Sequence, residues 1–579
     1  MSFLNTVRNK TANVVEKEKE EEKNFRLGDL LKEQGLLSDR DIQIIATEQK
    51  AIGGRFGEIA LNLGLVNETQ ITQALAKQAG MQYFDLRSED IDVDAAQFID
   101  SEKSREHEIL PLALNDNTLL VGITEPTNVK KRDLAKKFLG QHKLEFCAID
   151  KSELFLVQSR VFPDLNFQTK ALELAEQMGK DQNKDTSSLT PRLVNAIVWD
   201  ALSNKASDIH LVYGGDIFRI FYRIAGALRY MYGFKPQLYS RVAAQIKQAA
   251  GMEPGDKLHA QGGNFNFQTG SRTVNTRVSK LPTVPLQEGE SLVLRLLDQN
   301  RVSLNLKTLG FYPEDVEKLK KSCTMPYGMI LCTGPTGSGK TTTLYSMLSA
   351  ISAFDTKILT IEDPVEYQLP GICQVQVNAR AEITFASALR EFLRQDPDVI
   401  LVGETRDPET AKISIQAALT GHLLFSTLHT NDAAGAIPRL LNYDVDINGL
   451  QSSLAVIIAQ RLVRKLCKHC HEERPLTADE KELFLRHSVK APETVRIASE
   501  KKSSTCKFCN GGYSSPTIIY ETIYMDEDLR EMIRKGISHR EFQSAAIKKG
   551  MKTMIQCGLQ KVADHTTSFS EVLKVTRVG

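Results

Sequence analysis

The sequence lacks long apolar runs and lacks an excess of either charge. A helix needs about 18 consecutive apolar residues to span a bilayer, and no stretch of this chain approaches that length. The 73 basic residues nearly match the 72 acidic ones. Because a general nucleic-acid binder usually carries a basic excess, we expect no direct nucleic-acid partner.

The N-terminus also lacks the apolar segment of a secretory signal, and residues 1–24 form a charged leader. The nine cysteines are an odd number, which fits a reducing compartment better than a disulfide framework. We therefore expect a cytoplasmic protein. A chain of 579 residues is too long for one hydrophobic core, so roughly three to five domains are expected.

An internal repeat occupies residues 25–86. The tetrapeptide RLGD at 26–29 returns 29 positions later as RFGE at 55–58, and Gln49 matches Gln78 in the same register. Each copy is therefore a 24-residue unit, and five residues separate the copies. The pattern predicts a helical repeat domain with two short helices in each copy.

The second helix of each copy is expected to begin after a capping residue, Ser38 or Asn67. Further along the chain, apolar runs predict strands at 118–123, 217–224 and 291–297. We assign residues 87–165 to a second N-terminal α/β domain, 166–188 to a polar linker, 189–309 to an α+β domain and 310–579 to the catalytic core.

A phosphate-binding loop is the strongest motif. It follows an apolar run at 329–332 and leads into a predicted helix, which is the context that a Walker A motif requires. Backbone N–H groups of such a loop face phosphates, Lys340 would reach the β- and γ-phosphates of ATP, and Thr341 would ligate Mg²⁺. The predicted ATP-binding residues here are Gly334, Pro335, Thr336, Gly337, Ser338, Gly339, Lys340, Thr341 and Thr342.

Three more apolar runs end in residues suited to catalysis, namely Glu362, Glu404 and His429. Ligands of parallel α/β sheets collect at the carboxyl ends of strands, where these side chains would lie. Each acid by itself could equally cap a helix. Their occurrence beside a phosphate-binding loop favours catalysis.

These motifs together resemble the secretion ATPase superfamily, specifically the ATPases of type II secretion and type IV pilus assembly. The resemblance extends from about Arg26 to Val575. TIEDPVEY at 360–367 resembles the family's Asp box, 393–407 its Walker B region, and 419–432 its His box. The resemblance implies a multidomain α/β fold with a RecA-like P-loop ATPase core and a preceding α+β domain that is PAS-like.

The resemblance also implies roles for individual residues. Glu404 would organise Mg²⁺ and its water, Glu362 would orient or activate the attacking water, and His429 would sense the γ-phosphate. In a hexameric ring, Arg277 and Arg295 would reach the ATP of a neighbouring subunit. Surface ion pairs remain an equal alternative for these two arginines.

Two CxxC pairs, Cys467 with Cys470 and Cys506 with Cys509, predict a structural zinc site. The gap between the pairs exceeds the usual ribbon spacing, so the pattern leaves free thiols open. The family places a tetracysteine insert here, which implies zinc for the insert 467–509. His469 and His471 are possible substitute ligands.

The repeat resembles the N-terminal domain by which certain pilus and secretion ATPases bind cyclic diguanylate. Its arginines would stack on guanine or pair with phosphate, its glutamines would read base edges, and its leucines would supply apolar contacts. The alternative is a helical docking module whose leucines form the core. The predicted binding residues are Arg26, Leu27, Gly28, Leu30, Gln49, Arg55, Gly57 and Gln78.

The resemblance implies an ATP-hydrolysing motor, a homohexamer peripheral to the cytoplasmic face of the inner membrane. It would work with an inner-membrane platform protein and accessory assembly proteins to power type IV pilus assembly or type II secretion. Two other functions stay open. One is a DNA-transport or conjugation motor, and the other is mainly an effector of cyclic diguanylate.

Overall fold

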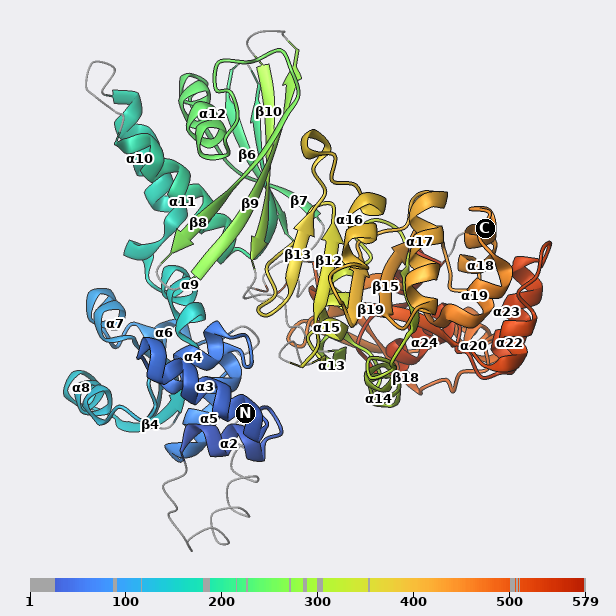
Figure 1. Cartoon of the computed structure of the whole chain (residues 1–579). Coiled ribbons are helices and arrows are strands. Elements are labelled where there is room, and N and C mark those ends of the chain that lie inside the picture. The colour runs from blue at the N-terminus through green and yellow to red at the C-terminus, as the bar shows by residue number, and fades with distance from the viewer. Residues whose placement is uncertain are drawn as a thin grey trace, which may run out of the picture. The chain divides into compact units, whose positions relative to one another are not determined.

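The computed structural model forms two compact units, Met1–Asn166 and Phe167–Gly579 (Figure 1). The predicted leader lies outside the described residues. The structure describes residues 26–86, 91–115, 117–180, 188–214, 216–224, 227–269, 272–284, 289–298, 306–351, 355–499, 506, 509 and 511–576.

Each copy of the repeat contains two helices. They are α2 (Leu27–Glu33) and α3 (Asp39–Ile52), followed by α4 (Phe56–Asn62) and α5 (Glu68–Gln78). The predicted caps are present, since Ser38 accepts a hydrogen bond from the N–H of Asp41 and Asn67 accepts one from the N–H of Gln70. These bonds satisfy amides that a helix start would otherwise leave free.

The two copies pack on each other reciprocally. A Cβ placed on Gly28 would lie 3.0 Å from the ring of Phe56, and one placed on Gly57 would lie 3.3 Å from Cδ2 of Leu27. Glycine at the two matched positions therefore lets α2 and α4 approach closely. Leu30, with 3% of its surface exposed, lies in the core between the copies.

A four-stranded sheet completes the first unit, in the order β1–β4–β3–β2. Its strands are β1 (Gln82–Tyr83), β2 (Ile109–Asn115), β3 (Thr118–Ile123) and β4 (Lys143–Ala148), and its helices are α6 (Val93–Ala96), α7 (Ser101–His107), α8 (Val129–Leu139) and α9 (Lys151–Val161). The strand predicted at 118–123 is confirmed. Because β1 pairs with β4, this sheet begins before the predicted boundary at residue 87.

The predicted linker at 166–188 is wrong over most of its length. Residues Phe167–Lys180 form the helix α10, and 181–187 lie outside the described residues. The ring of Phe167 stacks on that of Trp199 in α11 (Leu189–Ser203), with centroids 5.5 Å apart. Four residues of α10 are buried: Ala171, Leu174, Ala175 and Met178.

The α+β domain contains a six-stranded antiparallel sheet in the order β7–β6–β5–β10–β9–β8, accompanied by α12 (Gln237–Ala249). Its strands are β5 (Ala206–Tyr213), β6 (Phe218–Ile224), β7 (Ala227–Phe234), β8 (Gln261–Thr269), β9 (Arg272–Thr283) and β10 (Gly289–Asp298). The strands predicted at 217–224 and 291–297 correspond to β6 and β10.

A seven-stranded sheet forms the core, in the order β13–β12–β14–β15–β11–β16–β19. Its strands are β11 (Gly328–Thr333), β12 (Ile358–Glu362), β13 (Cys373–Gln376), β14 (Val399–Val402), β15 (Leu423–Leu428), β16 (Leu454–Leu466) and β19 (Tyr513–Tyr524). All neighbours pair in parallel except β16 and β19. The four predicted core strands are thus present, and their carboxyl ends meet at one edge of the sheet.

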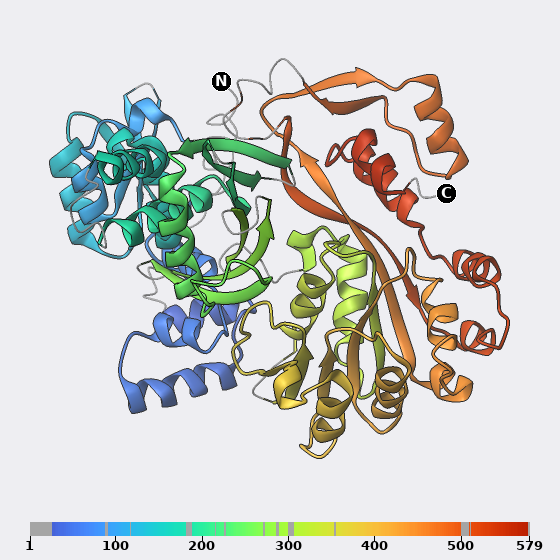
Figure 2. The same ribbon diagram turned by 90° about the horizontal axis from the view of Figure 1, so that it is seen from above.

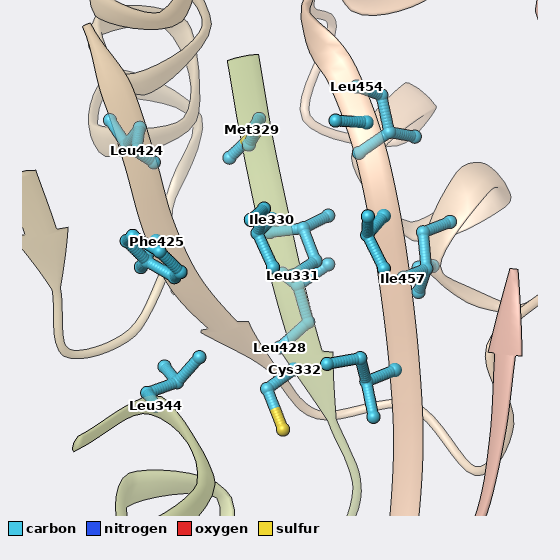
Figure 3. Close-up of a cluster of buried hydrophobic side chains, with 14 of the residues drawn as sticks. Met329, Ile330, Leu331, Cys332, Leu344, Leu424, Phe425, Leu428, Leu454 and Ile457 are labelled. Atoms are coloured by element: carbon cyan, nitrogen blue, oxygen red, sulfur yellow. The ribbon is translucent and has the colours of Figure 1, made fainter. Parts of the chain in front are cut away.

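The centre of this core is apolar. β11 lies between β15 and β16, and side chains such as Ile330, Phe425 and Ile457 gather around it (Figure 3). All three have less than 1% of their surface exposed, so they are sealed from water. Burial on both sides explains why β11 reads as a continuous apolar run.

Helices surround this sheet, and the last of them ends at Thr576. They are α13 (Leu306–Leu309), α14 (Pro313–Ser322), α15 (Lys340–Leu348), α16 (Phe385–Phe392), α17 (Pro408–Leu419), α18 (Ala436–Leu441), α19 (Ile447–Ser453), α22 (Glu527–Glu531), α23 (His539–Lys548), α24 (Met554–Ala563) and α25 (Phe569–Thr576). Among the described residues, no helix is both long and apolar enough to cross a membrane.

The region predicted as the tetracysteine insert contains a second, small sheet. β17 (His471–Pro475) and β18 (Thr494–Ala498) pair in an antiparallel manner, and α20 (Ala478–Arg486) lies between them in the chain. In Figure 2 this pair lies beyond one end of the long strands β16 and β19. Phe484 of α20 is fully buried and packs with Leu559 and Phe569 of the C-terminal helices.

Candidate active site and zinc cluster

The phosphate-binding loop joins β11 to α15, as the sequence predicts. Gly334, Gly337 and Gly339 have φ values of 148°, 77° and 87°, which L-residues with a side chain rarely adopt. A Cβ at Gly334 would lie 2.6 Å from the carbonyl oxygen of Gln460. Glycine is therefore required both for the backbone conformation and for the close approach of β16.

Gln460 supports the loop from the neighbouring strand, a role that sequence reasoning missed. Its Nε2 donates a hydrogen bond to the carbonyl oxygen of Ser338 at 2.8 Å, and its Oε1 accepts one from Thr343 Oγ1 at 2.8 Å. The side chain is fully buried. A polar residue inside the apolar strand 454–463 was the signal that could have revealed it.

Lys340 begins α15, so its own backbone lies at a helix N-terminus, where anions are favoured. Its Nζ donates hydrogen bonds to the carbonyl oxygens of Gly334, at 2.8 Å, and Pro335, at 3.3 Å. Burial lowers the pKa of Lys340. Thr341 and Thr342 follow in the first turn of the same helix, half-buried.

Glu404 and His429 come together, as predicted. His429 Nε2 lies 3.2 Å from Glu404 Oε2, and Arg406 forms an ion pair with the same carboxylate. Burial, followed by the nearby charges of Lys340, Arg406 and Arg439, lowers the pKa of His429. A lowered pKa favours the neutral imidazole.

Glu362 is held by three donors at the end of β12. Tyr345 donates to Oε2, while Thr360 Oγ1 donates to Oε1 at 2.6 Å and Gln374 Nε2 does so at 3.2 Å. Only 3% of Glu362 is exposed. Burial raises its pKa, and the three hydrogen bonds oppose that effect.

Backbone contacts bring the strand ends together. The N–H of Gly403 donates to the carbonyl oxygen of Ile361 at 2.8 Å, so the residue before Glu404 lies beside Glu362. The N–H of Thr430 donates to Thr333 Oγ1 at 3.0 Å, which places the residue after His429 beside the start of the phosphate-binding loop. The predicted catalytic residues thus share one edge of the sheet.

The two arginines of the α+β domain form ion pairs within the chain. Arg277 lies 3.2 Å from Glu366, and Arg295 Nε lies 3.0 Å from Asp208 Oδ1. The side chain of Arg295 is 64% exposed, whereas that of Arg277 is 23% exposed. Their reach toward a neighbouring subunit stays a prediction.

The four cysteines of the two CxxC pairs converge. Their sulfur atoms all lie within 4.8 Å of one another, with 3.9 Å between Cys467 and Cys506 and 3.3 Å between Cys470 and Cys509. The backbone N–H of His469 points at the sulfur of Cys467 at 3.4 Å, a donor that favours a thiolate. This donor set is suited to a closed metal site.

The predicted cyclic-diguanylate residues divide into two sets. Arg26 and Arg55 are exposed at matched positions, and Arg55 lies 3.6 Å from Glu125. Gln49 Nε2 donates to the carbonyl oxygen of Gly54 at 2.9 Å, and Gln78 is exposed on α5. The apolar set lies at the contact between the copies and comprises Leu27, Gly28, Leu30 and Gly57.

Comparison with known families accounts for most of the chain. The model of the Type II/IV secretion system protein family matches residues 182–574, which include the α+β domain and the core. The model of the MshEN domain matches residues 79–165, which include the four-stranded sheet. Both 24-residue copies of the repeat, at 26–49 and 55–78, lie before that second match.

Two relatives match most of the chain. The type IV pilus assembly ATPase PilB of Myxococcus xanthus is 34% identical over 565 residues, which are 95% of this chain and 98% of that protein. A putative type II secretion system protein E of Escherichia coli is 40% identical over 420 residues, covering 72% of this chain and 83% of that protein.

A solved structure described as MshE with cdg is 27% identical; it covers 24% of this chain and 99% of that chain, with a TM-score of 0.23. The two family matches and the relatives agree with the site geometry. The chain belongs to the Type II/IV secretion system protein family, as an ATPase with a RecA-like core and an N-terminal MshEN domain.

Proposed function

We propose that this ATPase is a hexameric motor that powers type IV pilus assembly or type II secretion from the cytoplasmic face of the inner membrane. The observation that carries the proposal is the similarity to PilB of Myxococcus xanthus, which covers 95% of this chain and 98% of that protein. The motor would act on an inner-membrane platform protein together with accessory assembly proteins.

Each of the residues at the sheet edge would have a separate role in ATP hydrolysis. Mg²⁺ would neutralise charge on the β- and γ-phosphates. Thr341 and Glu404 would hold Mg²⁺, and their position beside the loop supports this assignment. Lys340, whose amine now meets loop carbonyls, would turn to the phosphate oxygens of ATP. Arg277 and Arg295 would act on the ATP of an adjacent subunit.

Glu362 would orient the attacking water and accept its proton. The position of Glu362 at the end of β12, with its backbone beside that of Gly403 and Glu404, supports this role. His429 would sense the γ-phosphate. As a neutral imidazole 3.2 Å from Glu404, it can donate one hydrogen bond to that carboxylate or to a phosphate oxygen, but not to both through Nε2.

The four cysteines would hold one structural zinc ion. Zn–S bonds of about 2.3 Å in a tetrahedron separate sulfur atoms by about 3.8 Å. The distances of 3.9 Å and 3.3 Å lie near that value. The zinc would tie the end of β16 to the start of β19 and fix the insert 467–509.

Cyclic diguanylate would bind the repeat at 25–86 through its exposed arginines and through Gln49 and Gln78. The reciprocal packing of Gly28 on Phe56 and of Gly57 on Leu27 supports two equivalent half-sites. Leu27 and Leu30 would shape the contact between the copies. The remaining segments would serve as a second N-terminal domain at 87–165 and a PAS-like domain at 189–309.

Deleting the gene in its own bacterium tests the system served. Loss of surface pili would identify a pilus motor, and retention of an exported protein inside the cell would identify a secretion motor. Restoration by the wild-type gene but not by one encoding Lys340→Ala ties either defect to ATP turnover. A deletion strain with normal pili and normal export would refute the proposal.

A further inference from the structure

A hydrogen-bonded group surrounds the carboxylate of Glu362, and two of its members, Tyr345 and Gln374, lie outside the family motifs described above. Tyr345 comes from α15, the helix that the phosphate-binding loop begins, and Gln374 comes from the edge strand β13. Thr360 and Gln374 are paired in register on neighbouring strands, which places their side chains on one face of the sheet. Donors from three elements thus meet one catalytic side chain.

The orientation of Gln374 is fixed by its second partner. Its Oε1 accepts a hydrogen bond from the N–H of Leu369 at 2.6 Å, so its Nε2 must face Glu362. The same Nε2 lies 3.3 Å from the hydroxyl oxygen of Tyr345. Gln374 therefore contacts both Glu362 and the tyrosine that donates to it.

Tyr345 is itself held by an aromatic contact. Its ring meets that of Tyr367 edge to face, with centroids 4.6 Å apart and an angle of 82° between the planes. Its hydroxyl donates to Glu362 Oε2 and leaves the other carboxylate oxygen to Thr360 and Gln374. A carboxylate held from both sides cannot rotate freely.

We infer that Tyr345 and Gln374 are positioning residues, which fix the carboxylate of Glu362 so that one lone pair faces the attacking water. The inference rests on the role proposed above for Glu362. A carboxylate offers about four acceptor positions, and the three donors occupy three of them. Because Tyr345 lies on the loop's own helix, the same contact links the phosphate site to the water site.

Three single variants of the full chain test this inference. Tyr345→Phe keeps the ring and its packing but removes the donor, so kcat should fall by about tenfold while KM for ATP changes less than about twofold. Tyr524→Phe is the matched control. The Tyr524 hydroxyl, on β19 outside the catalytic motifs, is buried and has no hydrogen-bond partner among the described residues, so its removal should leave kcat unchanged. Gln374→Leu should behave like Tyr345→Phe.

The combination with Glu362→Gln separates the inference from its premise. If Glu362 orients the water, Glu362→Gln alone loses most of its kcat, and adding Tyr345→Phe lowers the residual rate no further. Wild-type turnover by Glu362→Gln would refute the role of Glu362 itself. If the single variant Glu362→Gln loses most of its kcat but the single variant Tyr345→Phe keeps wild-type kcat, only the inference is overturned. The inference would also be overturned if Tyr345→Phe abolished ATP binding, or if it lowered the melting temperature enough for unfolding to account for the loss of kcat. The tyrosine would then be structural.

Discussion

Arg277 of the α+β domain donates a hydrogen bond to the carbonyl oxygen of Val365 at 2.8 Å and lies 3.2 Å from the carboxylate of Glu366. Both partners belong to the segment that follows Glu362. The arginine proposed to act on a neighbouring subunit therefore holds, in its own chain, the segment next to the catalytic glutamate. The two roles compete, because one guanidinium cannot serve both places at once.

Mixing two inactive variants distinguishes these roles. Arg277→Ala and Lys340→Ala should each hydrolyse little ATP alone. If Arg277 acts across the subunit boundary, equal mixing should restore about a quarter of the active interfaces of a symmetric ring, since some intact loops then face an intact arginine. Phosphate release is the measurement. A mixture no more active than its components would assign Arg277 to its own chain.

Gln460 should prove necessary for ATP binding although it contacts no predicted ligand. Gln460→Leu removes the donor to Ser338 and the acceptor for Thr343, each part of a buried hydrogen bond of 2.8 Å. A buried polar group that loses its partner costs about 1 to 3 kcal/mol, so we expect the Kd for ATP to rise about tenfold or more. Thr343→Val should raise the Kd for ATP by a smaller factor in the Gln460→Leu variant than in the wild type. Full additivity of the two losses would contradict a shared support.

The sequence predicted the core strands that are buried on both faces, because such strands consist of consecutive apolar residues. β11, β12, β14 and β15 are short and buried on both faces, so they read as apolar runs with a turn or an acid after them. The edge strand β13 has no such run, and none of its four residues is fully buried. The contacts of Gln460 could not be predicted because its partner Thr343 is 117 residues away in the chain. Gln374 and Glu362 lie on different strands, whose pairing the sequence does not specify.

The missed helix α10 has a different cause. The polar composition that indicates a linker belongs to residues 179–188, which overlap only the last two residues of α10. The buried positions Ala171, Leu174, Ala175 and Met178 follow a spacing of three and four residues, which is the period of an amphipathic helix. Periodicity was therefore the better signal than polarity at this boundary.

Metal analysis should find one zinc ion per chain in protein purified without chelator. Cys467→Ser should lower that content and destabilise the insert, because a structural site loses much of its affinity with one of four thiolates. Cys373→Ser is the matched control, since Cys373 is exposed and lies outside the cluster. Equal zinc contents in the two variants would refute the assignment.

Asp200 should make the α+β domain less stable as pH rises. Burial raises its pKa to about 6 from an ordinary value of 3.8, although Tyr222 and Asn204 donate to it at 3.0 Å. Between these pH values the folded state binds a proton that the unfolded state has lost. The stabilisation is complete below about pH 4 and is lost as pH rises through about 6, by up to about 3 kcal/mol.

Asp200→Asn removes this titration and keeps the shape of the side chain. As pH rises from 4 to 7, the free energy of unfolding of the variant should therefore increase relative to that of the wild type, by about 1 to 3 kcal/mol. Unfolding followed in denaturant at several pH values measures the difference. A constant difference across that range would show that Asp200 does not titrate there.

Cyclic diguanylate should bind the full chain through the exposed arginines of the repeat. Arg26→Ala and Arg55→Ala should each weaken binding strongly, since a planar, always-charged guanidinium can stack on guanine or grip phosphate and alanine cannot. The two losses should be of comparable size, because the copies pack reciprocally through Gly28 and Gly57. The contact of Arg55 with Glu125 adds little, because both side chains are substantially exposed.

Calorimetry with the wild type and matched variants tests this last prediction. Gln49→Ala should weaken binding less than either arginine variant does, because Gln49 already donates a hydrogen bond to the carbonyl oxygen of Gly54. Lys50→Ala removes one exposed positive charge from the segment between the two copies, outside the predicted site, so this variant should bind as the wild type does. If Lys50→Ala weakens binding as much as Arg26→Ala does, the dinucleotide is attracted by the overall positive charge of the repeat and not by a specific site. If folded wild-type protein gives no heat with the dinucleotide, the repeat is a docking module, and its paired glycines serve only to bring the two copies together.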